Sequence, residues 1–305
     1  MGKARGERVD GVLLLDKSGG ISSNHALQKT RRLLNAAKAG HTGTLDPMAT
    51  GLLPLTFGEA TKYSADLLDA DKSYRATLKL GVTTRTGDAD GEVMAVRPVQ
   101  VDDAALDAVL MRHVGDIDQV PPMHSALKRD GRPLYELARA GIEVERAARR
   151  VTIRRLRRVE RSGDVVVVDV DCSKGTYVRV LAEDIGRDLG CGAHLAALRR
   201  TRVGPLTLES SVTLAALEAM PPPVRREWLR PADSLLATLA RVELDEAMAA
   251  RFRQGQRLAI DAEPRGERVR VYAGRELLGT ATINEWGVVE PERLVSSELT
   301  TEKSF

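Results

Sequence analysis

The pattern of hydrophobic and polar positions in the first third of the chain predicts two strands and a helix. Residues 11–16 form a short apolar run that is typical of a buried strand. Ser22 or Ser23 then supplies an N-cap for a helix that runs to about residue 35. The inner face of this helix consists of Ala26, Leu27, Thr30, Leu33 and Leu34. From residue 74 to residue 82 apolar and polar positions alternate, which predicts a half-buried strand with Tyr74 on its inner face.

Further along the chain, helices and strands follow one another in irregular order. Residues 103–114 have a helical pattern, and residues 151–160 and 164–172 predict a hairpin that turns at Ser162 and Gly163. Mixed elements in this order indicate an α+β or mixed α/β fold.

The last quarter of the chain has a different pattern. The consecutive prolines at residues 221–223 predict a linker, because consecutive prolines stop regular structure. Beyond residue 241 short strands are predicted at residues 268–272, 276–283 and 288–289, separated by Gly turns. We therefore expect a small β-rich domain of about 65 residues at this end.

Composition narrows the class of protein. The chain has 305 residues, 43% hydrophobic and 29% charged, which is typical of a soluble globular protein with one large and one smaller domain. No apolar run approaches the roughly 20 residues of a membrane span, and the polar start has no hydrophobic signal segment behind it. We expect a cytoplasmic protein with no membrane association. Cys172 and Cys191 form no Cys-x-x-Cys pair, so a disulfide framework or zinc cluster is not indicated and we expect buried or inert thiols.

Charge is unevenly distributed along the chain. Residues 128–161 hold twelve Lys or Arg against five Asp or Glu, a local charge of +7, whereas the whole chain carries only +3. Such a basic segment is the electrostatic footprint of a protein that binds a polyanion such as RNA. An Arg-rich, solvated face is the alternative interpretation.

The densest cluster of potentially reactive residues is the sequence GHTGTLDP at residues 40–47, followed by MATGLLP. Its glycines permit close backbone approach to a ligand, and Pro47 restricts Asp46 to an extended conformation, so the carboxylate is presented from a stiff loop. Turn or capping roles remain open for Asp46 and His41. The Gly-x-x-Gly clamp of KH domains is disfavoured, because the following Leu-Asp-Pro would break its second helix.

Arg179 is a second candidate. Thr176 is interpreted as the N-cap of a helix that carries Leu181 and Ile185, which places Arg179 in its first turn. A cation there opposes the helix dipole by roughly 0.3–1 kcal/mol, so an anionic partner is expected. Glu183, one turn on, is one possible partner.

The GHTGTLDPMATGLLP block resembles the catalytic-aspartate motif of TruB-type tRNA pseudouridine synthases, which isomerise uridine 55 in the T arm. Further blocks match this family in order: DKSYR at residues 71–75, SALK at 125–128, LYELAR at 134–139 and CSKGTYVR at 172–179. The resemblance covers residues 11 to about 205, with a weaker match at the C-terminus. It implies an α+β catalytic domain over residues 1–235 around a mixed, largely antiparallel sheet, with an RNA-binding thumb insertion at about 122–150. A PUA-like domain would follow at residues 241–305.

The resemblance also implies a role for each matching residue. Asp46 is the catalytic carboxylate, paired with Arg179, which keeps it ionised and fixes its direction. Tyr74 lies beside the target uracil, Tyr177 contacts the flipped nucleotide, and His41 lies against the RNA and helps to evict the base. Leu198 contributes a backbone contact to the uracil, and Lys17 and Lys62 are basic positions near the site. The thumb residues are Lys128, Arg129, Arg132, Arg146, Arg149 and Arg150. One departure is His124, where many relatives have Tyr.

These roles are consistent with the chemistry. The base must leave its stack at a cost of a few kcal/mol, and stacking on an aromatic ring returns roughly 1–3 kcal/mol. Phosphate-loop, Rossmann, zinc-hydrolase and serine-hydrolase motifs are not found, which fits an isomerase without cofactor or metal. We expect a monomer that binds the T stem-loop of tRNA without an obligate protein partner.

Three alternatives remain open at this point. A glycosidase would use Asp46 with a second carboxylate and would release a base or sugar. A non-catalytic tRNA-binding or tRNA-folding protein would not need a carboxylate in a basic groove; a folding role in addition to catalysis is also possible. A guide-RNA-directed relative would not need the basic insertion. Whether Asp46 attacks C1′ or abstracts a proton at C2′ is left undecided.

Overall fold

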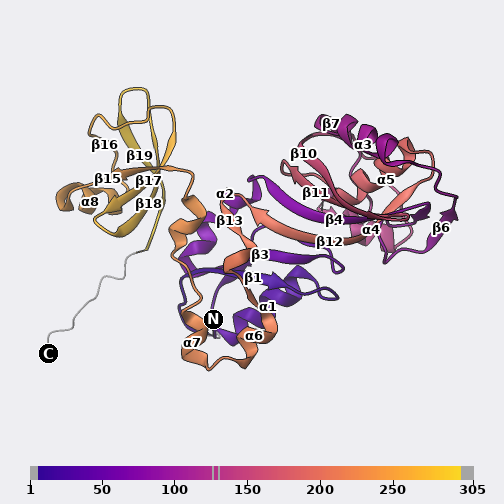
Figure 1. The fold of residues 1–305 in the computed structure, drawn as a ribbon. Coiled ribbons are helices and arrows are strands. Elements are labelled where there is room, and N and C mark those ends of the chain that lie inside the picture. The colour runs from indigo at the N-terminus through magenta and orange to yellow at the C-terminus, as the bar shows by residue number, and fades with distance from the viewer. Residues whose placement is uncertain (1–5, 126, 130, 297–305) are drawn as a thin grey trace.

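The computed structural model describes residues 6–125, 127–129 and 131–296, and these residues form two parts, each built on its own β-sheet (Figure 1). The N-terminal part contains a ten-stranded sheet and most of the helices, and the C-terminal part contains a five-stranded sheet. The described structure is therefore of the predicted α+β class. No helix in the described part of the chain is long and apolar enough to cross a membrane.

The large sheet has the strand order β14-β1-β3-β12-β4-β11-β10-β7, with β2 paired to β3 and β13 paired to β12. Its strands are β1 (Gly11–Lys17), β2 (Ala39–His41), β3 (Thr50–Phe57), β4 (Lys72–Leu80), β7 (Gly115–Gln119), β10 (Arg149–Ser162), β11 (Val165–Cys172), β12 (Ala193–Val203), β13 (Leu206–Thr207) and β14 (Val212–Thr213). Only the β1–β14 and β12–β3 pairs are parallel, so the sheet is mixed and largely antiparallel, as expected.

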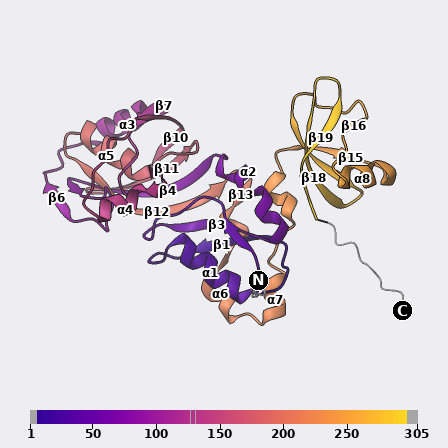
Figure 2. The same cartoon turned by 180° about the vertical axis from the view of Figure 1, so that it is seen from behind.

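Helices cover the two ends of this sheet separately. They are α1 (Ser23–Leu33), α2 (Ser64–Leu68), α3 (Asp103–Arg112), α5 (Val178–Asp188), α6 (Leu214–Ala219) and α7 (Pro222–Arg226), with 3₁₀ helices η1 (Gly58–Tyr63), η2 (Leu208–Ser210) and η3 (Ala232–Leu236). Figures 1 and 2 both show α3 and α5 near β10 and β11, and α1 and α6 near β1. One hydrophobic core forms around α3 and α5 and another around α1 and α6, and Tyr74 and Leu198 pack against both. A third core lies around η1 and η3.

Local sequence explains the elements that were predicted well. Ser22 caps α1 by accepting a hydrogen bond from the amide of His25 at 3.1 Å. In β11, Val166, Val168 and Val170 are buried on one face while the intervening positions are half-buried, which is the period of a strand with one face in the core. Cys172 and Cys191 are free and buried, as expected.

Three local predictions were wrong: the end of the strand that contains Tyr74, the cap of helix α5, and the linker at residues 221–223. The strand containing Tyr74 ends at Leu80 because Gly81 turns the chain with φ +79°, and Val82 begins a separate hairpin of β5 (Val82–Thr84) and β6 (Val93–Val96). Thr176 is not the cap of α5: the helix begins at Val178 after Tyr177 and has no side-chain cap. The Thr176 hydroxyl donates instead to the carbonyl of Ser173.

The prolines at residues 221–223 begin helix α7 rather than forming a linker. Proline is tolerated in the first turn of a helix, where its missing N–H would have no partner. The following chain stays on the N-terminal part: the Arg225 guanidinium donates to the carbonyl of Leu33, and Arg230 forms a bridge with Val12.

The C-terminal part is β-rich, as predicted. Its elements are β15 (Ala240–Glu243), α8 (Glu246–Arg253), β16 (Leu258–Ala259), β17 (Arg268–Ala273), β18 (Glu276–Ile283) and β19 (Val288–Leu294). Phe252 of α8 packs with valines and leucines of the five strands in one core. The sequence patterns missed β15, α8 and β16 and predicted β19 too short. Residues 297–305 of the expected domain lie outside the described residues.

The expected insertion at residues 122–150 contains the short strands β8 (Lys128–Arg129) and β9 (Arg132–Pro133) and helix α4 (Leu134–Arg139). Leu134 and Leu137 of α4 are its buried side chains. The side chain of Lys128 lies outside the described part of the structure, and so does Ala126.

Candidate active site

Asp46 lies in the loop between β2 and β3, and buried side chains hold both of its chain neighbours. The Ser23 hydroxyl accepts from the amide of Leu45 at 2.8 Å and donates to its carbonyl at 3.0 Å. On the other side, Lys17 Nζ donates to the carbonyl of Pro47 at 3.3 Å. The loop is thus fixed to α1 and to the end of β1, and it leaves 40% of the Asp46 side-chain surface exposed.

The Arg179 guanidinium joins Asp46 to two other segments. Its Nε lies 3.0 Å from Asp46 Oδ2 and 3.5 Å from Asp88 Oδ2. Its terminal nitrogens donate to the carbonyls of Thr86 at 3.1 Å and His124 at 2.7 Å. Only 5% of the Arg179 side chain is exposed, so these contacts are made largely out of water. Arg179 therefore fixes the direction of the carboxylate and attaches the insertion to the same point.

Asp88 was not found by sequence reasoning. It lies in the turn between β5 and β6, is 5% exposed, and accepts from the Thr86 hydroxyl and from the amide of Asp90. Its local sequence is that of an ordinary polar loop, and its partner Arg179 is far away along the chain. Glu183, the alternative partner of Arg179, forms no ion pair with it among the described residues.

Three charges and burial together set the protonation of Asp46. Burial raises its pKa above the usual value; Arg179 lowers it, Asp88 raises it and Lys17 lowers it, and the net shift is upward. The ion pair thus favours the ionised form, as expected, but does not outweigh burial. Burial also lowers the pKa of Lys17 to about 8, although Asp46 acts in the opposite direction.

Tyr74 and Leu198 lie on the adjacent strands β4 and β12, where the two cores of the large sheet meet. Burial raises the pKa of Tyr74, Arg200 lowers it, and the Asp46 carboxylate raises it further, so the phenol and the carboxylate lie within electrostatic range of one another. The backbone carbonyl of Leu198 accepts from the Thr50 hydroxyl at 3.3 Å.

His41 ends β2 and is half-buried, and its Nδ1 is a buried atom without a hydrogen-bond partner in the described structure. Burial lowers its pKa, and the nearby Arg200 guanidinium lowers it further. An imidazole with a pKa below its usual value is neutral at pH 7. His41 is thus an uncharged group beside the Asp46 loop.

Tyr177 precedes α5 and connects it to β7. Its amide donates to Gln119 Oε1 at 3.0 Å, which ties the start of α5 to the end of β7, the strand that precedes the insertion. Burial raises the pKa of Tyr177, and the Asp46 carboxylate adds to this shift. The structure therefore brings both predicted tyrosines to the surroundings of Asp46.

Lys62 is the one predicted site residue that the structure places elsewhere. Its amine lies 2.6 Å from Glu59 Oε2 and donates to the carbonyl of Leu294 at 2.8 Å and to the hydroxyl of Ser296 at 3.1 Å. These partners belong to η1 and to the end of the C-terminal part. The prediction that Lys62 lies near the catalytic carboxylate was therefore wrong, because η1 directs it to the contact between the two parts.

The basic segment at residues 128–161 is less positive in space than in sequence. Six of its arginines form ion pairs with aspartates from other segments: Arg150 with Asp116, Arg154 with Asp71, Arg155 with Asp171, Arg157 with Asp169, Arg158 with Asp103 and Asp107, and Arg161 with Asp103. The count along the chain missed these partners because they lie outside the segment. Among the described residues, the charge without such a partner is thus concentrated in the insertion.

The predicted insertion arginines differ in their surroundings. Arg129 donates to the carbonyl of Glu145, Arg132 is exposed on β9, and Arg149 is exposed at the start of β10. Arg150 Nε lies 3.5 Å from Asp116, with 72% of its side chain exposed. Arg146 Nη2 lies 3.7 Å from Glu143, and its Nε is buried without a partner in the described structure.

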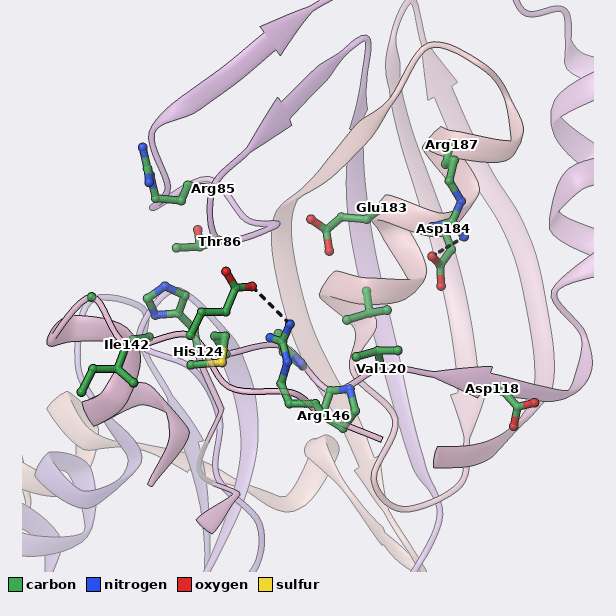
Figure 3. Close-up of a pocket in the computed structure, with 17 residues that line it drawn as sticks. Arg85, Thr86, Asp118, Val120, His124, Ile142, Arg146, Glu183, Asp184 and Arg187 are labelled. Carbon is green, nitrogen blue, oxygen red and sulfur yellow. Dashed lines mark ion pairs between the residues drawn. The ribbon is translucent and has the colours of Figure 1, made fainter. Parts of the chain in front are cut away.

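A cavity of about 720 Å³ separates the insertion from α5. Figure 3 shows Arg85 and Thr86 on one side of it, His124, Ile142 and Arg146 on another, and Glu183, Asp184 and Arg187 along the helix. Beside this cavity, the His124 carbonyl attaches the insertion to Arg179. No group of three or more His, Cys, Asp or Glu side chains that could hold a metal ion occurs among the described residues.

Comparisons with known proteins identify the family of this chain. The N-terminal domain of TruB family pseudouridylate synthases matches residues 31–178, the C-terminal domain of tRNA pseudouridylate synthase B matches residues 179–237, and the C-terminal region of pseudouridine synthase II TruB matches residues 240–295.

Similar proteins match almost the whole chain. It is 58% identical over 296 residues to tRNA pseudouridine synthase B of Aromatoleum aromaticum, covering 97% of this chain and 96% of that protein. It is 61% identical over 294 residues to tRNA pseudouridine synthase B of Burkholderia mallei, covering 94% of this chain and 97% of that protein. A chain of the crystal structure of a Cbf5–Nop10–Gar1 complex has 27% identity and a TM-score of 0.73, covering 93% of this chain and 84% of that one. The chain belongs to the TruB family of pseudouridine synthases.

Proposed function

We propose that this protein converts uridine to pseudouridine in tRNA, at position 55 of the T arm, and that Asp46 initiates the reaction. The observation that carries the proposal is the half-exposed Asp46 carboxylate, held by Arg179 and flanked by Tyr74 and Tyr177. The relatives that match nearly the full length of the chain bear the name tRNA pseudouridine synthase B. The assignment to position 55 comes from the resemblance of the GHTGTLDPMATGLLP block to TruB-type enzymes.

The geometry suggests how the chain would perform the reaction. Arg179 Nε holds Asp46 Oδ2, so the other carboxylate oxygen is free to face the ribose. In one route Asp46 attacks C1′ and the C1′–N1 bond breaks with its electron pair going to the uracil; in the other Asp46 removes the C2′ proton and the same bond breaks to leave a C1′=C2′ double bond. The uracil turns and C5 bonds to C1′, which releases the Asp46 carboxylate in the first route and is accompanied by return of the proton from Asp46 to C2′ in the second. The C5 proton then leaves and N1 gains a proton. No atom is lost overall, which defines an isomerisation.

Several side chains would hold the flipped nucleotide during this sequence. Tyr74 offers a ring where the two cores meet, and a stacked base gains roughly 1–3 kcal/mol there. The neutral His41 would lie on the RNA side and occupy the space that the base leaves. Tyr177 would contact the nucleotide from the side of the insertion, and the Leu198 backbone would contact the uracil.

The insertion would provide the RNA grip. Arg149 and Arg150 are exposed, and Lys128, Arg129 and Arg132 extend the same positive region along the sequence. A protein with its own phosphate contacts needs no guide RNA, so we propose a monomer that acts alone on tRNA in the cytoplasm.

A glycosidase is the competing enzyme class, and Asp88 is the only second carboxylate on Arg179 among the described residues. Asp88 is 5% exposed and already accepts hydrogen bonds from Thr86 and Asp90, so it is poorly placed to activate a water molecule. The product distinguishes the two classes, because a glycosidase releases free uracil and the isomerase releases nothing.

The direct test is to incubate the protein with an unmodified tRNA transcript and to map pseudouridine by nucleotide-resolution sequencing. We expect one modified position, uridine 55, and none in a transcript with cytidine at that position. Free uracil in the reaction mixture would favour the glycosidase, and modification at other uridines would remove the position-55 assignment.

A further inference from the structure

Arg200 of β12 is the largest fully buried side chain in the described structure, with 1% of its surface exposed. It forms no ion pair with a carboxylate anywhere in the described residues. Its Nε donates to the carbonyl of Leu52 at 2.7 Å, and its Nη2 donates to the carbonyl of Gly43 at 3.1 Å. A buried charge without a counter-ion is costly, and a guanidinium does not lose its proton in proteins. A side chain that only filled the core would be apolar, so this cation calls for a functional explanation.

The motif around Asp46 is folded against this side chain. Gly43, three residues before the carboxylate, has φ +82° and accepts from Arg200. Gly51, five residues after it, has φ +100°, and a Cβ there would lie 2.2 Å from the carbonyl oxygen of Arg200. The Gly43 carbonyl thus binds the Arg200 guanidinium, and Gly51 allows the motif to pack against the backbone of the same residue. The loop that presents Asp46 is therefore attached to Arg200 at both of its ends.

Strand register places Arg200 against the aromatic ring of the site. Arg200 is directly opposite Tyr74 in the antiparallel pair of β12 and β4, and opposite Gly51 in the parallel pair of β12 and β3. Burial raises the pKa of Tyr74 and the Arg200 charge acts against this shift, so the guanidinium lies within electrostatic range of the phenol. Residues directly opposite each other in a sheet interact most strongly. The same side chain is therefore bonded to the Asp46 loop and lies beside Tyr74.

We infer that Arg200 is a positioning residue for the isomerisation: it holds the Asp46 loop beside Tyr74, and its uncompensated charge stabilises the negative charge that develops on the uracil. The inference rests on the proposed function. When the C1′–N1 bond breaks, the electron pair goes to the base in either mechanism, whether Asp46 attacks C1′ or C2′ loses a proton. A positive charge held in place behind the Tyr74 ring stabilises the negatively charged uracil, and the protein does not have to rearrange for it to do so.

The test measures the single-turnover rate on a T stem-loop RNA, together with its Kd, for Arg200→Met and Arg200→Lys. We expect Arg200→Met to slow the reaction roughly 10- to 100-fold, the effect of losing a hydrogen bond to a charged group, with Kd within about twofold. Arg200→Lys should restore part of the rate because it keeps the charge. Arg199→Lys is the matched control, because Arg199 is partly exposed and its guanidinium lies 2.7 Å from the Asp16 carboxylate, and its rate should be unchanged.

Coupling to Tyr74 separates this role from a merely structural one. Tyr74→Phe keeps the ring but removes the hydroxyl, so it should slow the reaction, and Arg200→Lys should cost less in the Tyr74→Phe background than in the wild type. Independent, multiplicative effects would overturn the inference, as would a wild-type rate in Arg200→Lys and Arg200→Met. If thermal unfolding shows that Arg200→Met does not fold, the rates of Arg200→Lys, Tyr74→Phe and the double variant test the inference instead. A wild-type protein that forms no pseudouridine refutes the proposed function, whereas an active wild type with unaffected Arg200 variants refutes only this inference.

Discussion

Replacing Asp88 by Asn removes one charge from the Arg179 network while keeping the shape of the side chain. The amide oxygen can still accept from the Thr86 hydroxyl and from the amide of Asp90, so the turn between β5 and β6 should keep its structure. The variant no longer has the negative charge 3.5 Å from Arg179 Nε. Arg179 then has Asp46 as its sole anionic partner among the described residues, and it is held less firmly.

The size of the effect follows from this geometry. At an effective dielectric constant near 20, two charges at this separation attract by about 5 kcal/mol before desolvation is considered. A hydrogen bond to a charged group contributes about 1.5–3 kcal/mol net. When this free energy no longer helps to position Asp46 in the transition state, the rate falls by about 10- to 150-fold. RNA affinity should hardly change, because Asp88 is buried.

The pH dependence has a defined sign. Asp88 raises the pKa of Asp46, so its neutralisation lowers that pKa. The reaction needs ionised Asp46, and the rate rises with pH through that pKa. The acid limb of the single-turnover pH–rate profile should therefore move to lower pH in Asp88→Asn, although the plateau is lower.

The assay is a single-turnover pH series on a T stem-loop RNA, with Asp90→Asn as the matched control, because Asp90 is an exposed aspartate of the same turn. Asp90→Asn should keep both the plateau and the acid limb. An Asp88→Asn enzyme with a plateau within twofold of wild type, or with its acid limb moved to higher pH, would refute the role given to this network.

Two further predictions concern the RNA grip and a buried lysine. Replacing Arg149 and Arg150 by Ala should weaken RNA binding and lower the slope of log K against log salt by about 0.7–0.9 for each phosphate that the protein no longer neutralises, because both are exposed and the Asp116 partner of Arg150 is itself half-exposed. The Ala variants of Arg155 and Arg157, whose partner aspartates are largely buried, should keep the slope. Equal slopes for both pairs would remove the first pair from the interface. Burial lowers the pKa of Lys72 from 10.5 to about 8, so the folded state binds fewer protons than the unfolded state between these values. The unfolding free energy of the wild type relative to Lys72→Met should therefore rise by about 1.4 kcal/mol per pH unit in this window, and a flat or falling difference in chemical denaturation would contradict it.

The elements that could be predicted from the sequence are those determined by local pattern. Helix α1 has its cap and its apolar face within a dozen residues, and the β10–β11 hairpin has its turn and its alternating valines within one segment. Helix α7 was missed because consecutive prolines were interpreted as a linker, although they fit the first turn of a helix.

The parts of the site that escaped prediction depend on pairing between distant strands. Arg199 and Arg200 are adjacent basic residues in the sequence, yet Arg199 is partly exposed and pairs with Asp16, whereas Arg200 is fully buried opposite Tyr74. Which of the two points inward is decided by the register of β12, which shifts at two irregular positions. The segment itself carries no signal for this choice.

The predictions made from charged residues failed for a similar reason. Lys62 and the arginines of β10 were interpreted from their own segments, but their partners come from elsewhere: Leu294 and Ser296 for Lys62, and aspartates of neighbouring strands and α3 for the arginines. Asp88 is the converse case, a polar loop residue that becomes part of the site only through Arg179. Electrostatic interpretation of a sequence therefore needs the fold before pairs can be assigned.

In the proposed reaction the Asp46 carboxylate performs chemistry and is not needed for RNA binding. Asp46→Asn should be combined with T stem-loop RNA, and both the Kd and the pseudouridine formed in a single turnover should be measured. We expect a Kd within a few-fold of wild type and no detectable pseudouridine. Retained turnover in Asp46→Asn would contradict this proposal, and so would a weakening of binding large enough to explain the missing product.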